Sequence, residues 1–293
     1  MEKAKKRRGD RKDGYWVRDV DAMHVLFPFL APSRADNEAV MSEVVDLTAV
    51  NQYIAKKNAE NPEFKYTIFH VICAAIAKTC LLRPKMNRFY AGQRLYQRKD
   101  IVLSFMVKKR FVDDSEEGVA IITMDQEGDQ PPIEQIYEKV KKIVYSVRKN
   151  NEMDGTTDKM DMLVKLPRPL LRLATSLLRW LDYHGMYPDM LMYDDPYFSS
   201  VFLSNLGSIK MHANYHHLAD WGTNSCFVLV GEKKPTPFYQ ADGSCEVREA
   251  LELGMTIDER IADGMYFANS IKLLRRLFEQ PELLDLPMGA PVE

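Results

Sequence analysis

Three short stretches of the sequence hold the side chains best suited to proton transfer. The first, "IDERIADG", puts Glu259 on an expected turn between a strand and a helix. The second, "SNLG", puts Ser204 at an expected strand end, with Gly207 expected at positive φ. The third, "MHANYHHLADWG", brings together His212, His216 and His217, half of the histidines in the chain. Carboxylates and imidazoles can accept protons, so these stretches indicate acid–base chemistry.

The elements that must position these residues alternate along the chain. Runs rich in apolar and β-branched residues predict strands that begin near residues 43, 101, 118, 197, 224 and 245. Helical periodicity is expected over residues 51–60, 67–82, 131–150 and 264–277, with Thr48 and Thr67 as N-caps of the first two. A hairpin is expected around Ala91–Gly92. Interleaved strands and helices predict a single two-layer α/β or α+β domain.

Composition narrows the class of protein. A formal charge of -2 argues against a protein that coats nucleic acid, so no nucleic-acid partner is expected. The basic stretch over residues 1–14 is expected to be a disordered tail, and no apolar run is long enough to span a membrane. Four widely spaced cysteines predict reduced thiols in a cytoplasmic protein, without a disulfide framework or a metal site; they are Cys73, Cys80, Cys226 and Cys245.

A helix-rich insert is expected over residues 155–195. Within it, "KLPRPLLRLATSLLRWL" has basic residues on one side of a helix and leucines on the other. Two readings stay open for this segment. It could be an ordinary helix that covers a core, or it could make weak contact with a membrane surface through residues 163–181.

Two of the stretches, in this order and at this separation, carry a resemblance to a known family. "YFSSVFLSNLGSI" resembles the strand with the S-N-L-G turn in the dihydrolipoyl acyltransferases of 2-oxo acid dehydrogenase complexes. "IDERIADGMYFANSIKLLRRLFEQPELLDLP" is similar to that family's D-H-R-x-x-D-G turn and the helix after it. The chloramphenicol acetyltransferases share the fold, and their turn has the sequence H-H-x-x-x-D-G. The resemblance covers most of residues 35–285, apart from the insert.

This resemblance implies a chloramphenicol-acetyltransferase-like fold, a mixed sheet with covering helices that assembles as a homotrimer. The active site would be a channel between subunits, entered by coenzyme A from one end and by the acyl partner from the other. In the family, a histidine deprotonates the attacking group and a serine or threonine stabilises the oxyanion, a role that falls here on Ser204. The resemblance also implies structural roles at the site, an N-cap for Asp263 before Gly264, an ion pair for Arg260 and backbone shaping for Asn205.

The sequence departs from the family at Glu259, which stands where the histidine is expected. Moving a thiol proton to an ordinary imidazole is uphill by about 2 pKa units, whereas moving it to an ordinary glutamate is uphill by about 4.2 units. Burial can raise the pKa of a carboxyl group enough to close this gap. Three readings stay open: Glu259 is a replacement base, the site is retired, or the base comes from elsewhere. His216 and His217 are the candidates for the third reading.

These observations predict an acyltransferase-like catalytic domain over residues 15–293. It would move an acyl group between coenzyme A, as a substrate, and an unknown small acceptor. Neither a metal nor a lipoyl domain is expected in this chain. The alternative is a catalytically inactive trimer that keeps the fold and works as a binding or scaffold protein.

Overall fold

The computed structural model describes residues 7–108, 117–149 and 165–292. Its helices are α1 (Ala22–Leu30), α2 (Thr48–Ala59), α3 (Ile68–Leu82), α4 (Pro132–Lys149), α6 (Arg168–Tyr183), α7 (Asp189–Met192) and α8 (Gly264–Glu279). Its strands are β1 (Gly14–Trp16), β2 (Glu38–Asp46), β3 (Arg88–Ala91), β4 (Arg94–Arg98), β5 (Ile101–Lys108), β6 (Glu117–Met124), β7 (Val201–Asn205), β8 (Cys226–Val230), β9 (Lys234–Tyr239) and β10 (Cys245–Asp258).

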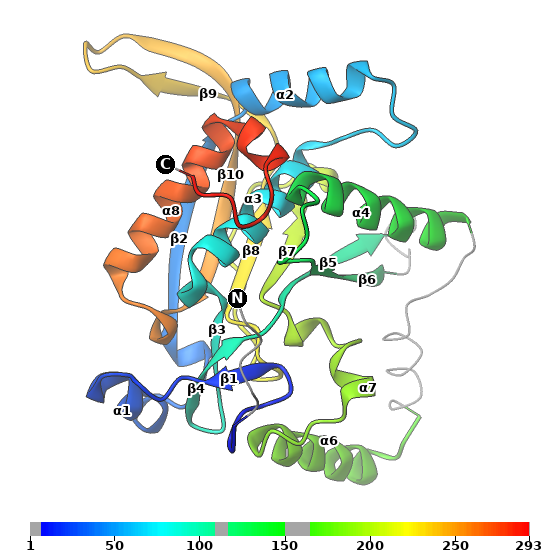
Figure 1. The fold of residues 1–293 in the computed structure, drawn as a ribbon, viewed down its shortest axis with the longest axis vertical. Coiled ribbons are helices and arrows are strands. Elements are labelled where there is room, and N and C mark those ends of the chain that lie inside the picture. The colour runs from blue at the N-terminus through cyan, green and yellow to red at the C-terminus, as the bar shows by residue number, and fades with distance from the viewer. Residues whose placement is uncertain (1–6, 109–116, 150–164, 293) are drawn as a thin grey trace.

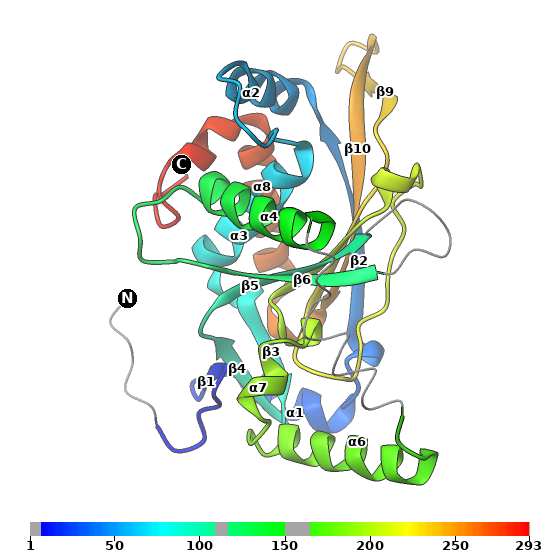
Figure 2. The same ribbon diagram turned by 90° about the vertical axis from the view of Figure 1, so that its right-hand side faces the viewer.

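The main sheet is mixed, as the resemblance implies. Its strands lie in the order β2-β10-β8-β7-β5-β6, and β9 pairs with the first part of β10. β7 runs parallel to both β5 and β8, whereas the other pairs are antiparallel. Helices α2, α3, α4 and α8 cover one face of this sheet (Figures 1 and 2). The two-layer fold class is therefore confirmed.

Helix α3 is the centre of the core, because its sequence is apolar almost all round. Thr67 caps it as predicted, in a capping box completed by the side chain of His70. Lys78 is fully buried on this helix, and its ammonium donates to the carbonyl oxygens of Leu283 (3.0 Å) and Pro287 (2.9 Å). These bonds hold the C-terminal segment against the helix. The N-cap predicted for α2 was wrong by one position. Thr48 is the first residue of the helix rather than its N-cap, and its backbone N–H donates to Asp46 at 2.8 Å.

A small sheet, β1-β4-β3, lies with α1 and α6 at one end of the molecule (Figures 1 and 2). The hairpin predicted at Ala91–Gly92 joins β3 to β4. The disordered tail predicted over residues 1–14 needs correction: residues 1–6 lie outside the described residues, but the segment from Arg7 packs against the domain. Arg11 is only 3% exposed and pairs with Asp13 (2.9 Å) and Asp182 (2.6 Å). These ion pairs anchor the segment around Arg11, which was predicted from its composition to be a free tail.

The predicted insert contains α6 and α7, while its first residues, 155–164, lie outside the described residues. α6 is the basic amphipathic helix expected from the sequence. Part of its apolar side remains exposed, at Leu173 (65%), Leu177 (54%) and Trp180 (53%). Membrane contact through this helix stays a prediction. Among the described residues, no helix is long and apolar enough to cross a membrane.

Candidate active site

The turn that follows β10 is held by a buried ion pair. Asp258 ends the strand fully buried, and its two carboxylate oxygens accept from Nε and Nη2 of Arg260 at 2.8 Å each. The guanidinium also donates to the carbonyl oxygen of Ala31 at 2.9 Å and lies over the ring of Tyr90. Arg260 therefore makes an ion pair of the kind the resemblance implies, and it ties the turn to the segment after α1.

Unlike Asp258 and Arg260 on either side of it, Glu259 points away from the core. Its side chain is exposed and faces a pocket of about 790 Å³ between α1, β2 and the first turns of α8. Phe27, Met41 and Phe267 are among the apolar residues that line this pocket, which we call the Glu259 pocket. The position where the family carries its histidine thus opens onto a cavity large enough for a substrate.

A histidine that the sequence reasoning missed lines the same pocket. His24 lies in the first turn of α1, where Asp21 is the N-cap and accepts from the backbone N–H of His24 at 3.0 Å. The ring Nδ1 lies 2.9 Å from both carboxylate oxygens of Asp21, and this hydrogen bond lowers the pKa of Asp21. When Nδ1 donates to Asp21, Nε2 is the ring atom left to accept a proton. The signal in the sequence is the D-x-x-H spacing in "DAMH", which a helix start converts into a contact.

Asp263 and Gly264 begin α8 as the resemblance implies. The carboxylate of Asp263 accepts from the backbone N–H of Tyr266 at 2.9 Å, and this bond lowers the pKa of Asp263. Its ionic partner is Lys85, 3.8 Å away, rather than an arginine. A Cβ atom on Gly264 would meet nothing within 4 Å, so this glycine leaves open space at the pocket instead of relieving a close contact.

Ser204 lies on the sheet face opposite the helices, half-buried near the end of β7. Strand register places it level with Leu229 and, through that residue, with Gly254. Glu259 directly follows the end of β10, five residues after Gly254, so the two backbone positions are about 17 Å apart along the strands and about 10 Å apart across them. One chain therefore does not bring Ser204 and Glu259 together. Their predicted meeting across two protomers stays a prediction.

The residues around Ser204 keep backbone segments close together. Gly207 does not have the positive φ expected of it; Lys210 takes the left-handed conformation instead, with φ of 59°. Gly207 is needed for another reason, since a Cβ there would lie 2.6 Å from the carbonyl oxygen of Gly231. Asn205 ends the strand and precedes a short 3-10 turn, which fits the backbone role implied by the resemblance.

The loop that carries His212, His216 and His217 crosses the sheet face that also carries Ser204. The loop comes so close that a Cβ on Gly254 would lie 2.0 Å from the carbonyl oxygen of Asn214. His216 stacks on Phe227 with ring centroids 4.3 Å apart, and His212 lies 3.3 Å from Glu232. His216 and His217 lie in this loop with their ring centroids 4.6 Å apart. Among the described residues, neither ring hydrogen-bonds Ser204.

Comparison with known proteins confirms the resemblance carried by these two motifs. Residues 193–286 match the family model described as 2-oxoacid dehydrogenases acyltransferase (catalytic domain). This segment contains Ser204, the histidine loop and the turn with Glu259. No curated protein matches the chain in sequence.

Solved structures share the fold over most of the chain. A probable dihydrolipoamide acetyltransferase from Listeria monocytogenes is 15% identical with a TM-score of 0.57, covering 91% of this chain and 95% of that one. The dihydrolipoamide acetyltransferase of Azotobacter vinelandii is 17% identical with a TM-score of 0.56, covering 90% and 88%. A chloramphenicol acetyltransferase is 10% identical with a TM-score of 0.53, covering 86% and 92%. The chain has the chloramphenicol-acetyltransferase-like fold.

Proposed function

We propose that the chain is a coenzyme-A-dependent acyltransferase whose active site forms between two protomers. One protomer contributes the Glu259 pocket and the next contributes Ser204. The observation that carries the proposal is that Glu259, at the motif position of the family's histidine, opens onto a cavity of about 790 Å³. Self-association is supported by relatives described as the cubic core of a pyruvate dehydrogenase complex and as the catalytic core of a 2-oxoacid dehydrogenase complex.

In the proposed reaction, a base in the pocket takes the proton of the acceptor thiol or hydroxyl. The acceptor atom then attacks the acyl carbonyl carbon, and negative charge develops on the carbonyl oxygen. The hydroxyl of Ser204 donates to that oxygen, a contribution of about 2.7–4 kcal/mol for one well-placed donor. The carbon–sulfur bond to coenzyme A breaks, and the departing thiolate takes the proton from the base.

Two bases are available in the Glu259 pocket, and their chemistry differs. An ordinary imidazole is about 2 pKa units closer to a thiol than an ordinary carboxylate is. His24, held through Nδ1 by Asp21, is therefore the better matched proton acceptor. We assign the role of the base to His24, and Glu259 is the alternative base. The loop imidazoles of His216 and His217 are the third option.

The test measures binding of acetyl-CoA by calorimetry and release of the coenzyme A thiol with dihydrolipoamide as the first acceptor. Loss of a general base lowers turnover by about a hundredfold or more. We expect that result for His24→Gln, whereas Glu259→Gln changes turnover less. His184→Gln, at an exposed histidine directly after the end of α6, is the control.

The other outcomes separate the alternatives. If Glu259→Gln abolishes turnover and His24→Gln does not, the glutamate is the replacement base. If only His216→Ala or His217→Ala abolishes it, the base comes from the loop. Tight binding of acetyl-CoA without turnover contradicts the proposal and favours the scaffold protein.

A further inference from the structure

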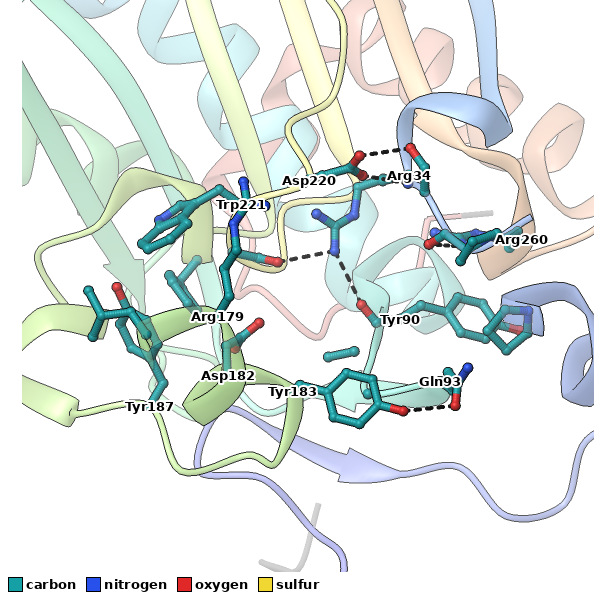
Figure 3. A pocket seen from close by; sticks show the side chains of 18 residues that line it. Arg34, Tyr90, Gln93, Arg179, Asp182, Tyr183, Tyr187, Asp220, Trp221 and Arg260 are labelled. Atoms are coloured by element: carbon teal, nitrogen blue, oxygen red, sulfur yellow. Dashed lines mark hydrogen bonds between the residues drawn. The ribbon is translucent and has the colours of Figure 1, made fainter. Parts of the chain in front are cut away.

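A second pocket of about 390 Å³ shares Arg260 with the Glu259 pocket (Figure 3). Its walls come from the segment after α1, the β3–β4 hairpin, α6 and the loop around Trp221. We call it the Arg34 pocket, because the guanidinium of Arg34 is the charged group at its centre in the figure. It contains neither Glu259 nor Ser204.

Arg34 is buried without a carboxylate on its guanidinium. It is 6% exposed, and its Nη atoms donate to the carbonyl oxygens of Ala219 (2.6 Å), Tyr90 (3.2 Å) and Gly222 (3.1 Å). Its Nε is buried and has no hydrogen-bond partner. The carboxylate oxygen of Asp258 closest to Nε is 3.9 Å away and already bonds Arg260. Burying a cation without a hydrogen-bonded anion is costly, so an anion in the pocket would relieve this arrangement.

The charged side chains around the pocket are unevenly paired. Arg260 pairs with Asp258, and Asp182 shares Arg11 with Asp13, at 2.6 and 2.9 Å. Asp220 accepts from the backbone N–H of Arg34 (2.7 Å) and from Ser33, and it offsets one further cation. The remaining cation is Arg179 of α6, which lines the pocket and pairs with no carboxylate in the part of the chain that the structure describes.

Apart from Ser33 and Gln93, the uncharged residues of the lining are apolar or aromatic. Tyr187 is 4% exposed and Phe198 is 6% exposed, and both line the pocket together with Trp221 and Leu178. Ligand pockets of this size hold a small molecule whose apolar body fills the cavity while a few polar groups fix its orientation. Asp182 and Asp220 also line the pocket, so they would repel a dianion more strongly than the single carboxylate that Arg179 can pair.

We propose that the Arg34 pocket binds a small organic carboxylate, with its carboxylate on Arg34 and Arg179 and an apolar or aromatic body against Tyr187 and Trp221. The guanidinium of Arg179 can donate two parallel hydrogen bonds to a carboxylate, whereas Arg34 has its Nε left to donate one. The site does not depend on acyl transfer, since none of its residues belongs to the proposed reaction.

The experiment is calorimetry on the full chain with benzoate and phenylacetate, with the two matching neutral amides and with inorganic phosphate. We expect the carboxylates to bind at least about tenfold more tightly than the amides or phosphate. Arg179→Gln should weaken carboxylate binding at least about tenfold. Arg172→Gln is the matched control, because it removes a charge from the same side of α6 but Arg172 does not line the pocket.

Several results would overturn the proposal. They are the absence of carboxylate binding at millimolar concentration, equal binding of acids and amides, and tighter binding of phosphate. Equal weakening by Arg179→Gln and Arg172→Gln would also overturn it, because the attraction would then be a general effect of the basic helix. Unfolding curves of both variants that match the parent chain exclude a folding defect.

Discussion

The Glu259 pocket and the Arg34 pocket share one lining residue, Arg260, yet they use their charged groups in opposite ways. In the first, Glu259 is exposed and His24 is held by one neighbour, so both side chains are available to a substrate. In the second, Arg34 and Arg260 are buried and joined to backbone carbonyls, so they hold loops together. Neighbouring positions on one tight turn thus serve different purposes, because one side chain points inward and the next outward.

The largest expected effect comes from breaking the ion pair between the pockets. Asp258→Ala leaves Arg260 buried and unpaired beside Arg34, and removing one partner of a buried pair typically costs about 3–5 kcal/mol of unfolding free energy. Denaturant unfolding measures this loss. Glu259→Ala is the control at the next residue, and we expect it to stay within about 0.5 kcal/mol of the parent because Glu259 is exposed. Equal losses would show that the turn does not depend on the pair.

A smaller effect on the unfolding free energy is expected from alanine substitution of two glycines, one lining each pocket. Gly222 lines the Arg34 pocket with a φ of 72°, and a Cβ there would lie 2.4 Å from the carbonyl oxygen of Tyr197. We expect Gly222→Ala to cost about 1–3 kcal/mol, because the backbone must shift. Gly264 lines the Glu259 pocket with open space around it, so Gly264→Ala should be close to neutral. Thermal and denaturant unfolding of the two variants test this contrast, and a costly Gly264→Ala would contradict it.

The parts of the fold that the sequence predicted are those with strong local patterns. Helix α3 was predicted because it is apolar almost all round and begins at a capping threonine, and the motif turn was predicted from its residue types. Strand β9 was missed because Pro235 and Pro237 argue against a strand. They are tolerated because, among the strands that the structure describes, β9 pairs with β10 alone and its other edge is unpaired.

The candidate sites were harder to predict, because they depend on contacts between distant segments. Helix α1 was not predicted, since its short apolar run contains Pro28, and with it the pairing of His24 with Asp21 was missed. The Arg34 pocket combines residues from position 28 to position 260, and no local pattern indicates that they meet. Arg11 was assigned to a free tail because its neighbours are basic, although its partners lie on α6 and beside it.

The central claim is that Ser204 of one protomer and Glu259 of the next face the same site. It is tested by a Ser204→Cys, Glu259→Cys double variant made with Cys245→Ser, treated with a short bismaleimide linker. Cys245 is the exposed native thiol, whereas burial raises the pKa of Cys73, Cys80 and Cys226 and shields them from the reagent. We predict covalent trimers on a denaturing gel for the double variant and monomers for each single variant. Monomers alone from the double variant would contradict the claim.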